Sequence, residues 1–93
     1  MQMDDIPQRD LQVVDQTVDG EKVLVHPRQG VVRVLNITGA FLWDRIDGRR
    51  SVAELASEMA ERYEVSPDQA QKDALTFFED LAQRGVIGLR MPV

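Results

Sequence analysis

The sequence contains no cysteine and one histidine, His26. The lack of thiols excludes disulfide bonds, thiolate nucleophiles and cysteine-ligated zinc or iron–sulfur centres. A single histidine is too few for a multi-histidine metal cluster. His26 precedes a turn proline and has no fixed partner in the sequence, so we expect a structural residue at the surface. These absences predict a protein without a metal site. The adjacent acidic residues Glu79 and Asp80 diverge on a helix and no phosphate-binding glycine loop occurs, so we also expect no cofactor and no catalytic residues.

Positive charge and long apolar runs are also scarce. Sixteen acidic side chains outnumber 11 basic ones, which gives a formal net charge of −5. Nucleic-acid binding and adhesion to anionic membranes both depend on positive charge, so an acidic domain is a poor candidate for either. No apolar run approaches the ~20 residues of a transmembrane helix, and the acidic start Met1–Asp5 is unlike a signal peptide. We therefore expect a cytoplasmic protein that binds neither nucleic acid nor membranes.

The chain of 93 residues is long enough for one domain, which we expect to cover residues 1–93 with an ordered core of about 10–88. The first eight residues and the last four carry no strong structural signal and are expected to be loosely held. The composition changes near Asn36: β-branched residues and close turns precede it, and helical spacing follows it. The predicted fold class is α+β, a three-stranded antiparallel meander followed by three helices.

Strands are expected at Leu11–Val14, Val23–His26 and Val31–Leu35. Asp19-Gly20 is a favoured pair for a two-residue hairpin turn, and Pro27–Gly30 has the residues of a second turn. Two short turns in succession predict a meander, with the third strand at an edge of the sheet.

The helices begin at clear capping residues. Asn36 is a plausible N-cap, Ser51 and Glu54 form a capping box, and Pro67 suits the first position of a helix. Helices are expected over Ile37–Ile46, from Ser51 to about Tyr63, and from Ser66 to about Arg84.

The third helix and the third strand both carry more apolar surface than a small core requires. The apolar residues of the helix form two stripes over an arc of about 160°, wider than the ~100° that one-sided packing needs. The stripes are Ala70, Ala74, Phe77 and Leu81, and Leu75, Phe78 and Ala82. The strand Val31–Leu35 has one charge, Arg33, and no proline to protect its edge. Such an edge is covered, paired with a second copy, or used to bind an extended peptide.

The order of these segments resembles the PqqD family, the pyrroloquinoline quinone biosynthesis D proteins and related peptide recognition elements. After the three strands, the resemblance lies in Leu35–Ala40, Asp47-Gly48, Ser51–Ala56, Tyr63–Val65 and Leu81–Ile87, and it covers about residues 10–88. It implies a three-stranded sheet packed on three helices, similar to a winged helix-turn-helix. It also implies a domain that is not an enzyme and that binds the leader of a ribosomally made precursor peptide as an added strand.

The family's groove lies between the third strand and the third helix. Carried over by position, the resemblance assigns peptide backbone pairing to Val31, Val32, Arg33, Val34 and Leu35. It assigns the apolar wall to Leu75, Phe78 and Ala82. A proline at Arg33 is expected to weaken peptide binding by deleting a hydrogen-bond donor.

The implied partners are the precursor peptide and a modifying enzyme, of the radical SAM type or another, with pyrroloquinoline quinone biosynthesis as one such pathway. Two other interpretations stay open at this point. A winged-helix DNA-binding or regulatory module would use the third helix, although its acidic residues would repel phosphate. A structural homodimer would pair the open edge with itself.

Overall fold

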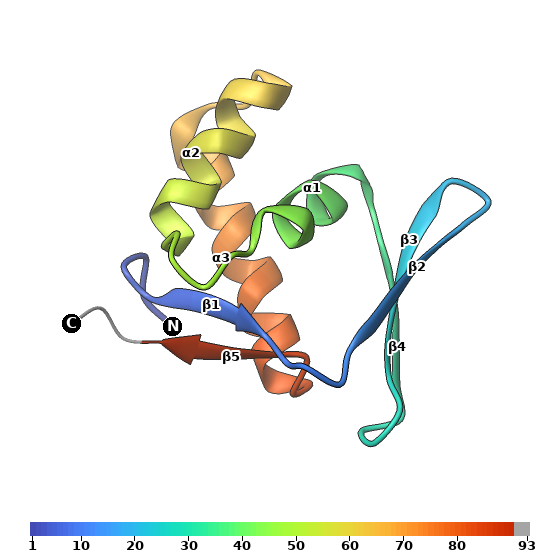
Figure 1. Ribbon diagram of the computed structural model, residues 1–93. Helices are drawn as coiled ribbons and strands as arrows, with labels where there is room; N and C mark the ends of the chain where they lie inside the picture. The colour runs from blue at the N-terminus through green and yellow to red at the C-terminus, as the bar shows by residue number, and fades with distance from the viewer. Residues whose placement is uncertain (91–93) are drawn as a thin grey trace.

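The computed structural model describes residues 1–90, which form five strands and three helices (Figure 1). The strands are β1 (Ile6–Arg9), β2 (Val14–Val18), β3 (Glu21–His26), β4 (Val31–Leu35) and β5 (Ile87–Arg90). The helices are α1 (Ile37–Arg45), α2 (Val52–Tyr63) and α3 (Pro67–Gln83). The sheet β2–β3–β4 stands to one side of the helices, and the pair β1–β5 contacts α3. The predicted α+β class, with a meander followed by three helices, is confirmed.

The first strand of the meander was predicted three residues too early. It runs from Val14 to Val18 instead of from Leu11. Asp19 and Gly20 both have positive φ, 52° and 82°, so they form a two-residue turn and strand pairing continues up to that turn. Every residue of β2 is exposed, so the strand lacks the apolar alternation that marks half-buried strands.

The two faces of this sheet differ. Leu24 and Leu35 point inward and are buried in the core. The outer face is rich in valine: Val32 and Val34 on β4 are 66% and 56% exposed, and Val23 and Val25 on β3 are partly exposed. The inner face therefore holds the sheet on the helices, and the outer face contributes nothing to the core.

Helix boundaries agree with the predictions to within one residue because the capping residues act as expected. The Asn36 side chain accepts a hydrogen bond from the Gly39 N–H at 2.8 Å. Ser51 and Glu54 form the predicted reciprocal capping box.

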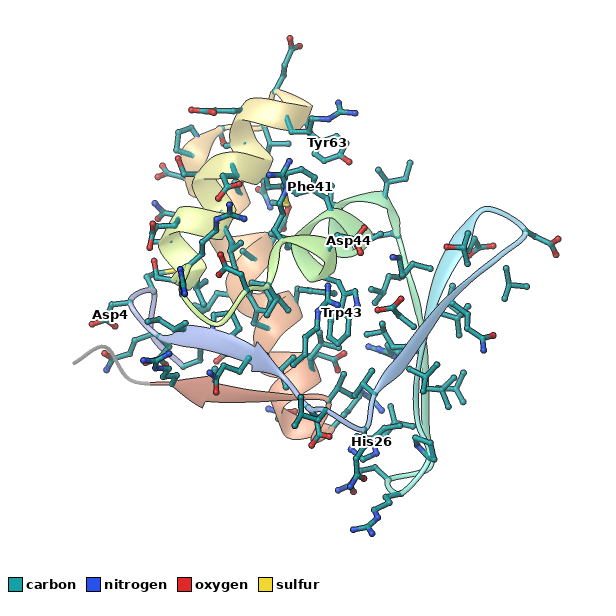
Figure 2. All side chains as sticks on the ribbon, viewed as in Figure 1. Asp4, His26, Phe41, Trp43, Asp44 and Tyr63 are labelled. Atoms are coloured by element: carbon teal, nitrogen blue, oxygen red, sulfur yellow. The ribbon has the colours of Figure 1, made fainter. Side chains whose placement is uncertain are left out.

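Trp43 connects the helices to the sheet (Figure 2). It is 1% exposed, and its indole N–H donates to Asp15 Oδ2 of β2 at 3.0 Å. The Arg9 guanidinium of β1 lies 4.5 Å from the ring centroid, a cation–π distance, and also donates to the Trp43 carbonyl. One side chain of α1 thus joins both sheets.

The first eight residues are held in place, contrary to the prediction. Ile6 pairs with Arg90 and Arg9 with Ile87, which makes β1 and β5 an antiparallel pair. The carbonyls of Asp5 and Met3 accept the first two amide hydrogens of α2, at 2.9 and 2.8 Å. These are groups that a helix start leaves unsatisfied. Of the last four residues, Arg90 belongs to β5 and 91–93 lie outside the described residues.

His26 is buried at 3% exposure and not at the surface as predicted. It sits on the inner face of β3, where its Nδ1 accepts from the Gln29 N–H at 3.3 Å and its Nε2 lies 3.4 Å from Asp10 Oδ1. A hydrogen bond from the Gln12 N–H, with a smaller contribution from His26, lowers the pKa of the Asp10 carboxyl. Both ring nitrogens are engaged, and the imidazole closes the β3–β4 turn.

Within residues 1–90, no helix combines the length and the apolar character needed to cross a bilayer.

Candidate functional site: the β4–α3 groove

Hydrogen bonding along β4 alternates between its two sides. The Asp19-Gly20 turn closes on the pair Val18 and Glu21, which is the hydrogen-bonded pair of a two-residue hairpin. Successive pairs alternate in an antiparallel ladder, so the odd-numbered residues of β3 bond β2 and the even-numbered ones bond β4. Their partners on β4 are Val31, Arg33 and Leu35.

Val32 and Val34 therefore direct their N–H and C=O groups away from β3. β4 is an edge of its sheet, and no other residue among 1–90 hydrogen-bonds these groups. The edge thus offers two donors and two acceptors in one row. The Arg33 N–H is already bonded to β3, so a proline there would break the existing ladder. Arg33→Pro therefore does not isolate the free edge, and its expected effect on peptide binding stays a prediction.

Helix α3 runs beside this edge and leaves a groove between them. Two adjoining hollows of about 370 and 330 Å³ share Asn36, Thr76 and Phe77. Together they are lined by Arg33, Val34, Leu35, Asn36, Thr38, Gly39, Leu42, Asp73, Thr76, Phe77 and Asp80, which we call the β4–α3 groove. Phe77 is its aromatic residue, and a Cβ added to Gly39 would meet the Phe77 ring at 3.0 Å. The absence of a side chain on Gly39 lets α1 and the Phe77 ring approach closely.

The apolar wall differs from the one predicted. Phe78 is fully buried in the core, and Ala82 is partly buried against it. Leu75 lines a separate hollow together with Met3. The terminal amino group of Met1 lies 3.8 Å from Glu79, so the N-terminal segment runs along this side of α3. The predicted second stripe therefore faces the N-terminal segment and the core.

Of the eight predicted site residues, the structure brings Arg33, Val34 and Leu35 into the groove. Val31 and Val32 lie in the same edge strand. From the sequence, Phe77 was placed on the first apolar stripe of the helix, and Thr76, Asp73 and Asp80 were not selected as site residues. The polar residues at 73, 76 and 80 recur every three to four positions around Phe77, a pattern typical of a half-exposed helix face.

One end of the groove carries two cations around one carboxylate. Arg33 contacts Asp80 Oδ2 through Nη2 at 2.7 Å and Nε at 3.0 Å, and Arg84 Nε contacts Asp80 Oδ1 at 3.0 Å. Burial raises the pKa of Asp80, but the hydrogen bonds from Arg84 and Arg33 outweigh that effect and lower it overall. Asp80 stays ionised, and the cluster keeps one net positive charge.

The opposite end of the groove is acidic. Asp73 lines it and accepts a hydrogen bond from Gln69 Nε2 at 2.8 Å. In the described part of the chain no cation lies within 4.0 Å of this carboxylate. The same residues 1–90 contain no group of three acidic or histidine side chains placed to hold a metal ion.

A free backbone edge beside a partly apolar groove is the arrangement of a peptide-binding module. The sequence model of the family described as Coenzyme PQQ synthesis protein D (PqqD) matches residues 21–87, more than half of the chain. The chain belongs to the PqqD family. No curated protein sequence gives a significant match to this chain.

Three solved structures share the fold. Lasso peptide synthetase B1 complexed with the leader peptide has a TM-score of 0.77 and 24% identity over 88% of this chain and 96% of that one. TbiB1 in complex with the TbiA(beta) leader peptide has a TM-score of 0.76 and 22% identity over 86% of this chain and 93% of that one. The third is the PqqD truncation of Methylobacterium extorquens PqqCD, solved by NMR as a functional and stand-alone recognition element for ribosomally synthesized and modified peptides. It has a TM-score of 0.75 and 22% identity over 89% of this chain and 88% of that one.

Proposed function

We propose that this chain binds the leader segment of a ribosomally made precursor peptide as a strand added to β4. The observation that carries the proposal is the row of unpaired backbone groups at Val32 and Val34 beside the β4–α3 groove. Two structural relatives were solved with leader peptides, and a third is a stand-alone recognition element. Strand addition at an edge draws its affinity from main-chain bonds and its specificity from side-chain pockets.

The site we propose is the edge Val31–Leu35 with Phe77 as the apolar contact, in place of Leu75, Phe78 and Ala82. Four main-chain hydrogen bonds and one aromatic contact must offset the ordering of a flexible peptide. We expect binding of roughly micromolar strength, about −8 kcal/mol.

We infer that the domain is not an enzyme and presents its peptide to a modifying enzyme, of the radical SAM type or another. The groove contains backbone groups, an aromatic ring, amide and hydroxyl side chains, and the charged side chains of Arg33, Asp73 and Asp80. Its Asp80 is fixed by two guanidinium groups, so its carboxylate is a poor proton acceptor. Pyrroloquinoline quinone biosynthesis, a single domain over residues 1–93 and the cytoplasmic location stay predictions.

Selection from a phage-displayed library of random 12-residue peptides tests the proposal. The wild-type protein is expected to enrich peptides. The Val34→Pro variant is expected to bind these enriched peptides at least tenfold more weakly than the wild-type protein does. The proline ring removes an edge donor and occupies the position of the incoming strand. Thr17→Pro is the matched control: it places a proline on the opposite edge of the same sheet, where the N–H also points away from β3. Circular dichroism verifies that both variants keep their helices.

If no peptide is enriched by the wild-type protein, peptide binding is contradicted. If the enriched peptides bind folded Val34→Pro as tightly as wild type, strand addition at β4 is contradicted. An equal loss in Val34→Pro and Thr17→Pro also counts against it, because only one of these edges borders the groove.

A further inference from the structure

The side chains of an added strand would point into the groove at alternate positions. A peptide bonded to Val32 and Val34 places the residues opposite Arg33 and Leu35 on the inner face, the face of α3. Residues two apart share a face, so a third inward position follows beyond Leu35, near Asn36. Three side chains of the peptide, from alternate residues, would therefore contact the groove.

These three positions have different surroundings. The position opposite Arg33 lies beside the Arg33–Asp80–Arg84 cluster, which keeps one net positive charge and has guanidinium donors outside its internal contacts. The side chains of Arg33 and Arg84 are 40% and 45% exposed, so a peptide can reach them. The middle position lies between Leu35 and Phe77.

The third position lies beside Asp73, where the hollow is also lined by Asn36, Thr38 and Thr76. No basic residue is among those lining side chains. Asp73 and Asp80 are seven residues apart on α3, about 10.5 Å along the helix. Inward side chains four residues apart on a strand are about 13 Å apart, which flexible charged side chains can match.

We propose that the β4–α3 groove selects peptides by the order of their charges: basic beside Asp73, apolar beside Phe77 and acidic beside Arg33 and Arg84. Antiparallel addition gives the more stable ladder, and it fixes the order from the N- to the C-terminus of the peptide. The recognised pattern is Lys or Arg, any residue, an apolar residue, any residue, then Asp or Glu. This inference rests on the proposed strand addition and specifies the class of peptide that binds.

Sequencing the enriched members of the random 12-residue library tests the pattern. Wild-type protein is expected to enrich a basic residue four positions before an acidic one, with an apolar residue between them. Asp73→Lys is expected to replace the preferred basic residue by an acidic one. Glu61→Lys makes the same change of charge on an exposed site of α2 outside the groove, so it is expected to keep the wild-type pattern.

Affinity measurements on one selected peptide complete the test. Asp73→Lys is expected to weaken it about two- to fivefold, the range of an exposed ion pair. Changing the peptide's basic residue to Glu is expected to restore the lost affinity in that variant only. Enriched peptides without a charge order, or with the acidic residue first, would overturn the inference and leave strand addition intact. Failure to enrich any peptide would contradict strand addition itself.

Discussion

The two outer strands of the three-stranded sheet differ in what lies beside them. β2 and β4 are both sheet edges, and each directs two residues' backbone groups outward, Asp15 and Thr17 on β2 and Val32 and Val34 on β4. β2 is exposed along its whole length. β4 has α3 beside it, with Phe77 and Asp80 lining the space between them. Unpaired backbone alone therefore does not define a docking site, because side-chain contacts are needed to hold and select the added strand.

The largest effect on peptide affinity is expected at Phe77, the aromatic residue of the β4–α3 groove. Phe77→Ala is predicted to weaken an enriched peptide about tenfold to a hundredfold, because a central aromatic contact carries much of the energy of a small interface. Titration calorimetry measures this loss. Phe41→Ala is the matched control: both rings are half-buried and edge-on to another aromatic, at 5.2 Å for Phe77–Phe78 and 5.5 Å for Phe41–Tyr63. Similar losses of affinity in the two variants would show that Phe77 acts through stability alone.

An effect of comparable size, but on folding and not on binding, is expected on the β2 side. Asp15→Ala leaves the buried indole N–H of Trp43 without its acceptor and is predicted to lower the free energy of unfolding by about 1–3 kcal/mol. Urea denaturation measures the change. Asp15→Asn keeps an acceptor oxygen at this position and is predicted to lower the free energy of unfolding by less than Asp15→Ala does. Equal losses in both variants would exclude the indole hydrogen bond as the cause, and a large loss of peptide affinity would contradict the distinction between the two edges.

The smallest effect is expected from the titration of Asp80. Its pKa in the folded protein lies below the usual 3.8, so its ion pairs stabilise the fold above that pH and are lost as the pH falls through the lowered value. The difference in unfolding free energy between wild type and Asp80→Asn is predicted to be present at about pH 6 and to shrink progressively as the pH falls below 3.8. Chemical denaturation at a series of pH values measures it. A difference that is constant over this range would show that the charge of Asp80 does not stabilise the fold.

The meander and the helix boundaries were predictable because their signals are local. Asp19-Gly20 dictates a two-residue turn, and Asn36 and Ser51 cap their helices with their own side chains. The position of β4 at a sheet edge follows from two short turns in succession, and the structure confirms it.

The apolar wall was not predictable because it depends on a long-range contact. Phe77 and Phe78 are neighbours about 100° apart on α3, and the helix alone does not decide which of them faces β4. The neighbouring elements decide it, because β5, which pairs with β1, contacts α3, and Met3 of the N-terminal segment lines the same hollow as Leu75. β1 contains Pro7, a residue that argues against a strand in a sequence pattern. The charge order of the groove was missed for the same reason, since Asp73 and Asp80 matter only once their side of α3 is known to face β4.

The shape of the groove depends on the one position of α1 that has no side chain. Gly39 lines the groove, and a methyl group there would lie 3.0 Å from both the Phe77 ring and the Asn36 Oδ1 atom that caps the helix. A change at position 39 would therefore press on the aromatic contact and on the start of the helix together. Differences in ligand preference among related chains can thus arise from α1 without any change in β4 or α3.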